Sequence, residues 1–195
     1  MTSLSANAAP LPGAPFVCYQ NGQLMVEGVA LSELARQHGT PLFVYSKAAI
    51  LAALAAYQRG LAGREALICY AMKANSSLAI LKLLADAGCG FDIVSAGELE
   101  RALAAGATPS KIVFSGVGKT RAEMRRALEA GVGCFNIESM AELDVLSDVA
   151  VACGQTAPVS IRVNPNVDAK THPYISTGLK GNKFGIAHEQ ALAAY

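Results

Sequence analysis

The sequence predicts an α/β fold, a TIM-type (β/α)8 barrel with about its first five βα units present, preceded by a short β-rich segment. Three observations lead to this prediction. Short apolar runs alternate with alanine- and leucine-rich stretches of helical spacing from residue 40 onward. The expected strands recur roughly every 20 to 25 residues, the length of a strand–helix unit whose strands run parallel. Ser or Thr residues precede the expected helices, and glycines follow them.

The chain opens with residues 1–14, which we expect to form a flexible tail. They lack the charged start and apolar centre of a secretory signal. Residues 15–40 carry alternating segments on either side of Asn21-Gly22, a dipeptide typical of tight hairpin turns. A strand pair and a helix are therefore expected there, as a segment of a β-rich second domain. Residues 41–195 are assigned to the incomplete barrel.

The elements of the barrel follow in order along the chain. The expected strands are Leu42–Tyr45, Leu67–Met72, Phe91–Val94, Ile112–Ser115, Cys134–Ile137 and Val159–Val163. The clearest helices are Leu78–Ala87, Ala96–Ala105, Arg121–Ala130 and Met140–Cys153, which start at Asn75 or Ser76, Ser95, Thr120 and Ser139. An open doubly wound sheet is the competing architecture. It usually has a Gly-rich turn after its first strand, where this chain has KANSS, so we prefer the barrel.

Composition excludes several classes of function. The 195 residues carry 16 basic and 15 acidic side chains, and no basic stripe suggests nucleic acid. No apolar run reaches the length of a membrane span. The five cysteines have no CxxC spacing and no clustered zinc ligands, so we expect reduced cysteines, no metal site and a cytoplasmic protein.

Function in a barrel sits at the carboxyl ends of its strands, and Lys73 ends one of them. An amine at a dry strand end can act as a nucleophile toward carbonyl groups, although a solvated strand-end lysine is equally compatible with the pattern. Asp92 ends the neighbouring strand and should lie near Lys73. Glu98 follows in the next helix and could tune proton transfer, or simply stabilise the helix start.

The other polar residues at or just after the expected strand ends are Ser95, Ser115, Asn136, Glu138, Arg162 and Asn164. Arg162 lies within an apolar strand, where an unpaired charge is costly. It should therefore meet a cofactor oxygen or, alternatively, a structural ion-pair partner. The polar segment 168–185 after this strand has the character of a binding loop or lid, and it contains His172.

Six segments in register resemble the N-terminal half of the diaminopimelate decarboxylase family: FVYS, CYAMKAN, GFDIVSAGELERALAAG, KIVFSGVGKT, FNIES and IRVNPNVDAKTHPYISTGLKGNKFGI. That family belongs to the alanine-racemase-like, fold type III decarboxylases that use pyridoxal phosphate. The resemblance covers about residues 14 to 195. It implies a barrel that binds pyridoxal 5'-phosphate and converts meso-2,6-diaminoheptanedioate to L-lysine and carbon dioxide, with no nucleic acid or membrane partner.

The resemblance also implies roles for particular residues. Lys73 would form the Schiff base with the cofactor, Asp92 would lie beside it, and Glu98 is a further acidic position. Arg162 would lie near the cofactor ring. His172, Ser176, Thr177 and Gly178 would belong to the active-site loop.

The family's later segments are not matched by this sequence: the ring-stacking histidine, the phosphate site and the residues contributed across a homodimer interface. We therefore expect this chain to be an N-terminal fragment that is inactive alone. Two other hypotheses stay open: a non-catalytic or regulatory half-barrel, and a related decarboxylase of another basic amino acid. The intact lysine and its flanking motif favour the enzyme.

Overall fold

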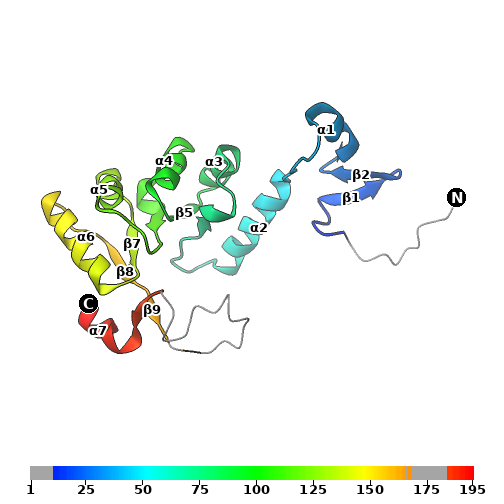
Figure 1. Ribbon diagram of the computed structural model, residues 1–195. Helices are drawn as coiled ribbons and strands as arrows, with labels where there is room; N and C mark the ends of the chain where they lie inside the picture. The colour runs from blue at the N-terminus through cyan, green and yellow to red at the C-terminus, as the bar shows by residue number, and fades with distance from the viewer. Residues whose placement is uncertain (1–10, 166, 168–183) are drawn as a thin grey trace. The chain divides into compact units, whose positions relative to one another are not determined.

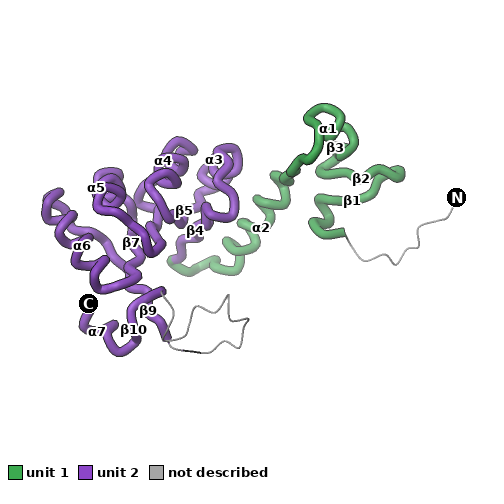
Figure 2. The backbone as a smooth tube through the Cα atoms, in the orientation of Figure 1, with its two compact units in different colours: residues 1–65 green, residues 66–195 purple. Residues whose placement is uncertain are grey.

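The structure is a computed structural model that describes residues 11–165, 167 and 184–195. It divides into two compact units, Met1–Glu65 and Ala66–Tyr195 (Figures 1 and 2). The sequence places a domain boundary at residue 40, whereas the two units divide after residue 65. The boundary at residue 40 stays a prediction. Within the described ranges, no helix combines the length and the apolar character that crossing a membrane requires.

The first unit begins with a small antiparallel sheet, as the hairpin signal predicts. Strands β1 (Val17–Gln20) and β2 (Gln23–Val26) pair across Asn21 and Gly22, whose φ angles of 51° and 77° suit a tight hairpin turn. A second two-residue turn leads to β3, which the sequence did not reveal. The remaining elements are β3 (Val29–Ala30), α1 (Leu31–His38) and α2 (Lys47–Gly60).

The second unit is a five-stranded parallel sheet in the order β4-β5-β6-β7-β8, confirming the predicted barrel arc. Helices α3 to α6 lie in a row along one side of these strands (Figure 1). The strands are β4 (Cys69–Ala71), β5 (Gly90–Ile93), β6 (Ile112–Phe114), β7 (Cys134–Ile137) and β8 (Val159–Ile161). The helices are α3 (Leu78–Asp86), α4 (Ala96–Ala104), α5 (Arg121–Ala130) and α6 (Met140–Ala152).

Short elements complete the second unit. One 3-10 turn follows β4, a second precedes β6, and a third leads into the last helix. A two-stranded parallel sheet precedes this third turn. These elements are η1 (Met72–Ala74), η2 (Pro109–Lys111), β9 (Val163–Asn164), β10 (Ile186–Ala187), η4 (His188–Gln190) and α7 (Ala191–Ala194).

The core lies between the sheet and its helices, and it follows from the two-residue period of a strand. The side chains of Phe91, Phe114 and Phe135 are fully buried, one from each of three adjacent strands. The rings of Phe114 and Phe135 stack with their centres 5.9 Å apart. Because successive side chains point to opposite faces, Asp92 and Asn136 must project to the other face of the sheet. Because the phenylalanines are buried against the helices, Asp92 and Asn136 lie on the face that forms the barrel interior.

The helix boundaries agree with the sequence signals. The hydroxyl groups of Ser95, Thr120 and Ser139 each accept a hydrogen bond from the backbone N–H three residues on. Helix α3 differs by one residue, since its N-cap is Ser77 and the Asn75 side chain accepts from the N–H of Ser77. The glycines predicted to end the four helices all have positive φ: Gly88, Gly106, Gly131 and Gly154.

Two strand predictions need correction. Residues 42–45 form no strand, and Phe43 is 85% exposed. A strand exists only through pairing, and this segment has no pairing partner among the residues that the structure describes. The predicted strand Val159–Val163 is interrupted at Arg162. Its N–H bonds to Ile137 of β7, whereas its C=O accepts from Ile186 of β10, so the pairing partner changes there.

Candidate active site

A pocket of about 610 Å³ lies at the carboxyl ends of the parallel strands. Strands β4 to β8 each contribute to it, directly or through the residues that follow them, because parallel strands end at the same edge. The lining residues are Lys73, Asp92, Val94, Ser115, Gly116, Val117, Asn136, Glu138, Ser160, Arg162 and Phe184. The pocket therefore brings together Lys73, Asp92 and Arg162, the three residues on which the sequence prediction depended.

Lys73 enters the pocket from η1, directly after β4. Ala71 pairs with Asp92, so Lys73 lies two residues beyond that register position and at the same end of the sheet. The preceding Met72 is buried, but Lys73 is exposed. Solvent therefore reaches Lys73 in the described part of the chain, so this strand end is not the dry environment that the sequence suggested.

Asp92 is held by side chains of two neighbouring strands. The Ser115 hydroxyl donates to Asp92 Oδ1 at 2.5 Å, and Asn136 Nδ2 donates to Ser115 Oγ at 2.9 Å. The Cys134 thiol lies 3.9 Å from Asn136 Oδ1. These contacts cross β5, β6 and β7 in one line, so the carboxylate of Asp92 has a defined orientation at the pocket floor.

Arg162 forms the structural ion pair that the sequence left as an alternative. Its Nη1 donates to Glu138 Oε1 at 3.0 Å and to Oε2 at 3.3 Å, and the Glu138 side chain is only 4% exposed. The guanidinium carbon lies 4.9 Å from the ring centre of Phe184, a cation–π distance. Nε and Nη2 of Arg162 have no partner among the described residues, so part of the guanidinium remains available to a ligand oxygen.

Sequence reasoning missed Lys119, which lies in the loop after β6. Its ammonium donates to the carbonyls of Gly116 and Asn136, both at 2.7 Å, and to Glu142 Oε1 at 2.6 Å. The Lys119 side chain is 1% exposed. The other Glu142 oxygen accepts from the N–H of Glu138. This buried cation ties together the loops that border the pocket, and the GK dipeptide alone gave no signal of it.

The structure places Glu98 at a helix start. Its carboxylate accepts the N–H of Val94 at 2.7 Å, and its own N–H donates to Ser95 Oγ at 3.2 Å. Glu98 is not among the residues that line the pocket. This geometry favours the structural alternative, and a catalytic role for Glu98 stays a prediction. The predicted loop residues His172, Ser176, Thr177 and Gly178 lie outside the described residues.

Three of the cysteines behave as structural thiols. Burial, together with the nearby Cys89, Asp92 and Cys134, raises the pKa of Cys69 to about 11. Burial also raises the pKa values of Cys89 and Cys134. These thiols therefore stay protonated at neutral pH, where the thiolate is the reactive form. All five cysteines are free.

The profile of a family described as "Pyridoxal-dependent decarboxylase, pyridoxal binding domain" matches residues 47–195, which is most of the chain and includes every residue of the pocket. The chain belongs to this pyridoxal-dependent decarboxylase family. The fold prediction is thereby confirmed: the second unit is an incomplete pyridoxal-phosphate-binding barrel.

Members of the decarboxylase family with known names are similar over nearly the whole chain. The diaminopimelate decarboxylase of Pseudomonas aeruginosa is 62% identical over 177 residues, covering 91% of this chain and 43% of that protein. The Vibrio cholerae enzyme of the same name is 57% identical, covering 90% and 42%. The chain therefore spans less than half the length of these relatives.

Solved structures give the same result. A crystal structure of diaminopimelate decarboxylase from M. jannaschii in co-complex with L-lysine superposes with a TM-score of 0.85 at 42% identity, covering 93% of this chain and 44% of that one. The Helicobacter pylori enzyme complexed with L-lysine has a TM-score of 0.81 at 50% identity, covering 84% and 42%.

The pocket residues fit the cofactor of the decarboxylase family. Among the described residues, Lys73 is the one lysine that lines the pocket, and an aldehyde cofactor requires an amine to form its Schiff base. The N–H groups of Arg162 that have no partner in the described part of the chain suit an anionic or phenolic oxygen. The volume is also in the range of cofactor sites. These residues can hold the aldehyde end and one ring oxygen of pyridoxal phosphate.

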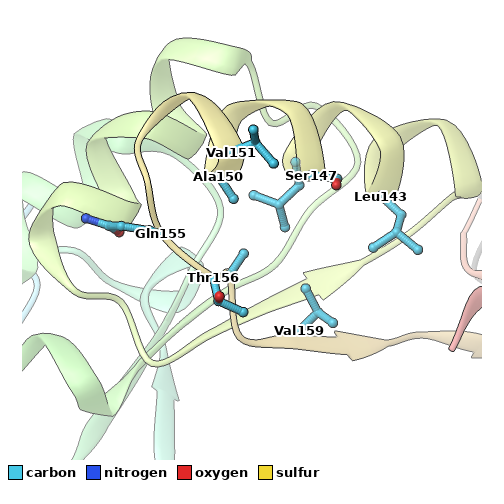
Figure 3. Close-up of a pocket in the computed structure, with 9 residues that line it drawn as sticks. Leu143, Ser147, Ala150, Val151, Gln155, Thr156 and Val159 are labelled. Carbon is cyan, nitrogen blue, oxygen red and sulfur yellow. The ribbon is translucent and has the colours of Figure 1, made fainter.

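A second pocket, of about 310 Å³, differs in chemistry. It lies between helix α6 and strand β8 and is lined by side chains such as Leu143, Ala150, Val151 and Val159 (Figure 3). None of its lining residues is ionisable. It therefore resembles a packing groove on the helical side of the sheet, and the candidate chemistry belongs to the pocket of Lys73.

Proposed function

We propose that the whole protein is a diaminopimelate decarboxylase that converts meso-2,6-diaminoheptanedioate to L-lysine and carbon dioxide with pyridoxal 5'-phosphate. The observation that carries this proposal is the gathering of Lys73, Asp92 and Arg162 in one strand-end pocket, in a chain 62% identical to an enzyme of that name. The wider proposal places the enzyme in the cytoplasm as a homodimer. Residues 15–40 would belong to its β-rich second domain.

Bound pyridoxal phosphate supplies an electron sink that makes loss of an α-carboxylate possible. The chain's own residues do the rest of the work proposed here. Lys73 binds and orients the cofactor through its amine. Asp92, whose Oδ1 is engaged by Ser115, offers Oδ2 as a proton acceptor in the same pocket. Arg162, held by Glu138, places its free N–H groups toward a cofactor oxygen.

The test is an assay of the whole protein with pyridoxal phosphate and meso-2,6-diaminoheptanedioate, measuring lysine and carbon dioxide in equal amounts. Lys73→Ala should abolish turnover, since no other lysine of the described residues lines the pocket. Lys82→Ala is the matched control, because Lys82 is an exposed helix residue paired with Asp86. Lysine, ornithine and arginine serve as competing substrates. Faster release of carbon dioxide from any of these three would replace the proposed substrate.

A further inference from the structure

We propose that Ser115 and Asn136 are positioning residues that hold Asp92 as a proton acceptor for the amine of Lys73. This inference deepens the proposed function and rests on it, since it assumes that Lys73 must react with an aldehyde. Neither residue carries a charge, and both act through Asp92. The direction of each hydrogen bond in the line that crosses β5, β6 and β7 determines what each group can do.

The direction starts at Asn136. Its Nδ2 amide nitrogen has only N–H donors, so its 2.9 Å contact requires Ser115 Oγ to accept. The single hydroxyl proton of Ser115 is then left for Asp92 Oδ1 at 2.5 Å. A hydroxyl that is already an acceptor on one side becomes the donor on the other. Asp92 Oδ1 is thereby fixed as an acceptor.

Cys134 supports the orientation of the amide. Its Sγ lies 3.9 Å from Asn136 Oδ1. Burial raises the pKa of this thiol, so it keeps its proton and can donate to the amide oxygen. Reversing the amide would place its N–H groups toward an S–H donor and its oxygen toward Ser115. Cys134, Asn136 and Ser115 therefore each donate to the next group in the line, and Asp92 is the final acceptor.

The register explains why these side chains meet. Asp92 and Asn136 belong to the sheet face opposite the buried phenylalanines, and Ser115 follows the last residue of the strand between them. With Oδ1 taken by Ser115, Oδ2 remains for the pocket that Lys73 shares. An ammonium must lose a proton before its nitrogen attacks an aldehyde, and a carboxylate held in one orientation is a suitable acceptor.

The experiment measures how fast pyridoxal attaches to Lys73 of the whole protein freed of bound cofactor, trapped with borohydride and quantified by peptide mass spectrometry. Labelling of the exposed Lys82 in the same sample is the internal reference. We expect Ser115→Ala to slow Lys73 labelling roughly tenfold relative to Lys82, because the acceptor loses its orientation. Ser115→Thr keeps the hydroxyl and should restore the wild-type ratio.

Further variants separate positioning from a general loss of structure. Asn136→Leu keeps the side-chain shape without its donor and should also slow Lys73. Ser147→Ala, a change of the same kind on the exposed face of α6, should leave the ratio unchanged. In an Asp92→Asn background, Ser115→Ala should have no further effect, since Ser115 acts only through Asp92.

Two results would overturn the proposal in distinguishable ways. If Lys73 of Ser115→Ala and of Asn136→Leu is labelled as fast relative to Lys82 as in the wild type, the positioning role is wrong. The proposed function is then unaffected. If wild-type Lys73 reacts no faster than Lys82, the assignment of Lys73 fails, and the proposed function and the positioning role fail together.

Discussion

At the residue scale, the two partners of the Glu138–Arg162 ion pair differ in burial. The Glu138 side chain is 4% exposed and the Arg162 side chain is 45% exposed. A buried carboxylate that loses its cationic partner keeps the full cost of desolvation. A half-exposed guanidinium that loses its partner is still solvated. The pair is therefore needed chiefly by Glu138, and Arg162 is free to serve a ligand with its remaining N–H groups.

This asymmetry predicts different costs for the two single changes. Arg162→Met should lower the free energy of unfolding by about 3 kcal/mol, because it strands a buried charge. Glu138→Gln should cost only about 1 kcal/mol, since an amide oxygen can still accept from Arg162. Urea unfolding of both variants at neutral pH checks this. An equal or larger loss for Glu138→Gln would contradict the account.

At the scale of elements, three of the four strand–helix units with helices α3 to α6 start their helix in the same way. Ser95, Thr120 and Ser139 are each followed three residues later by a glutamate that binds backbone N–H groups at the helix start. The glutamate of α5, Glu123, also reaches the N–H of Ala96 in the preceding unit. The start of one helix is thus joined to the start of the next.

Glu123 should make stability depend on pH in acid. The N–H of Ala96 first, and then the N–H and hydroxyl of Thr120, lower its pKa from the usual 4.5. A lowered pKa in the folded state gives stability that is complete above 4.5 and is lost as the pH falls through the lowered value. The free energy of unfolding of the wild-type chain should therefore be about 1 kcal/mol higher than that of Glu123→Gln at neutral pH. This difference should become smaller in acid.

The measurement is denaturant unfolding of both chains from neutral pH into acid. Glu129→Gln is the control on the same helix, because Glu129 accepts no side-chain hydrogen bond from any described residue. At neutral pH, Glu129→Gln should lower the free energy of unfolding by less than Glu123→Gln does, because it removes no such hydrogen bond. A gap for Glu123→Gln that stays constant as the pH falls would disprove the role of its carboxylate.

The backbone of Ser110 lies very close to Gly133, just before β7, which predicts a steric effect on stability. A Cβ atom at Gly133 would collide with the Ser110 carbonyl oxygen, which is backbone and cannot move aside cheaply. Gly133→Ala should therefore cost about 2 kcal/mol or more of unfolding free energy. Gly118→Ala is the matched control: its Cβ meets nothing within 4 Å, and neither glycine has positive φ. The control should change stability by less than about 0.5 kcal/mol, and equal losses would refute the steric cause.

At the scale of the molecule, strands β4 and β8 lie at the two ends of the parallel sheet. Among the residues that the structure describes, each of them pairs with one neighbouring strand of this sheet. A flat row of unpaired N–H and C=O groups is a template for another strand. The exposed apolar side chains of residues 42–45 add surface of the kind that favours association.

We therefore expect the 195-residue polypeptide, purified alone, to self-associate as its concentration rises. Sedimentation or light scattering over a dilution series would show a mass that increases above 20.2 kDa. The same measurement in moderate salt is the control, since edge pairing through hydrogen bonds does not weaken with screening as ion pairs do. A constant monomer mass would show that the edges are protected.

The sequence by itself determined the features that depend on neighbours along the chain. Helix starts at Ser95, Thr120 and Ser139, helix ends at glycines, the strand–helix rhythm and the position of Lys73 at a strand end were all predicted from local chemistry. The strand expected at residues 42–45 failed because a strand needs a partner elsewhere in the fold.

Only the tertiary structure decided which side chains meet. Ser115 lies 23 residues from Asp92 and 21 from Asn136, and Glu138 lies 24 from Arg162. Lys119 is buried only because Asn136 and Glu142 arrive from the next strand and helix. These contacts follow from the register of parallel strands, which is set by non-local pairing and by the burial of one sheet face. No local pattern encodes that register, so the line of hydrogen bonds to Asp92 became visible only in the folded chain.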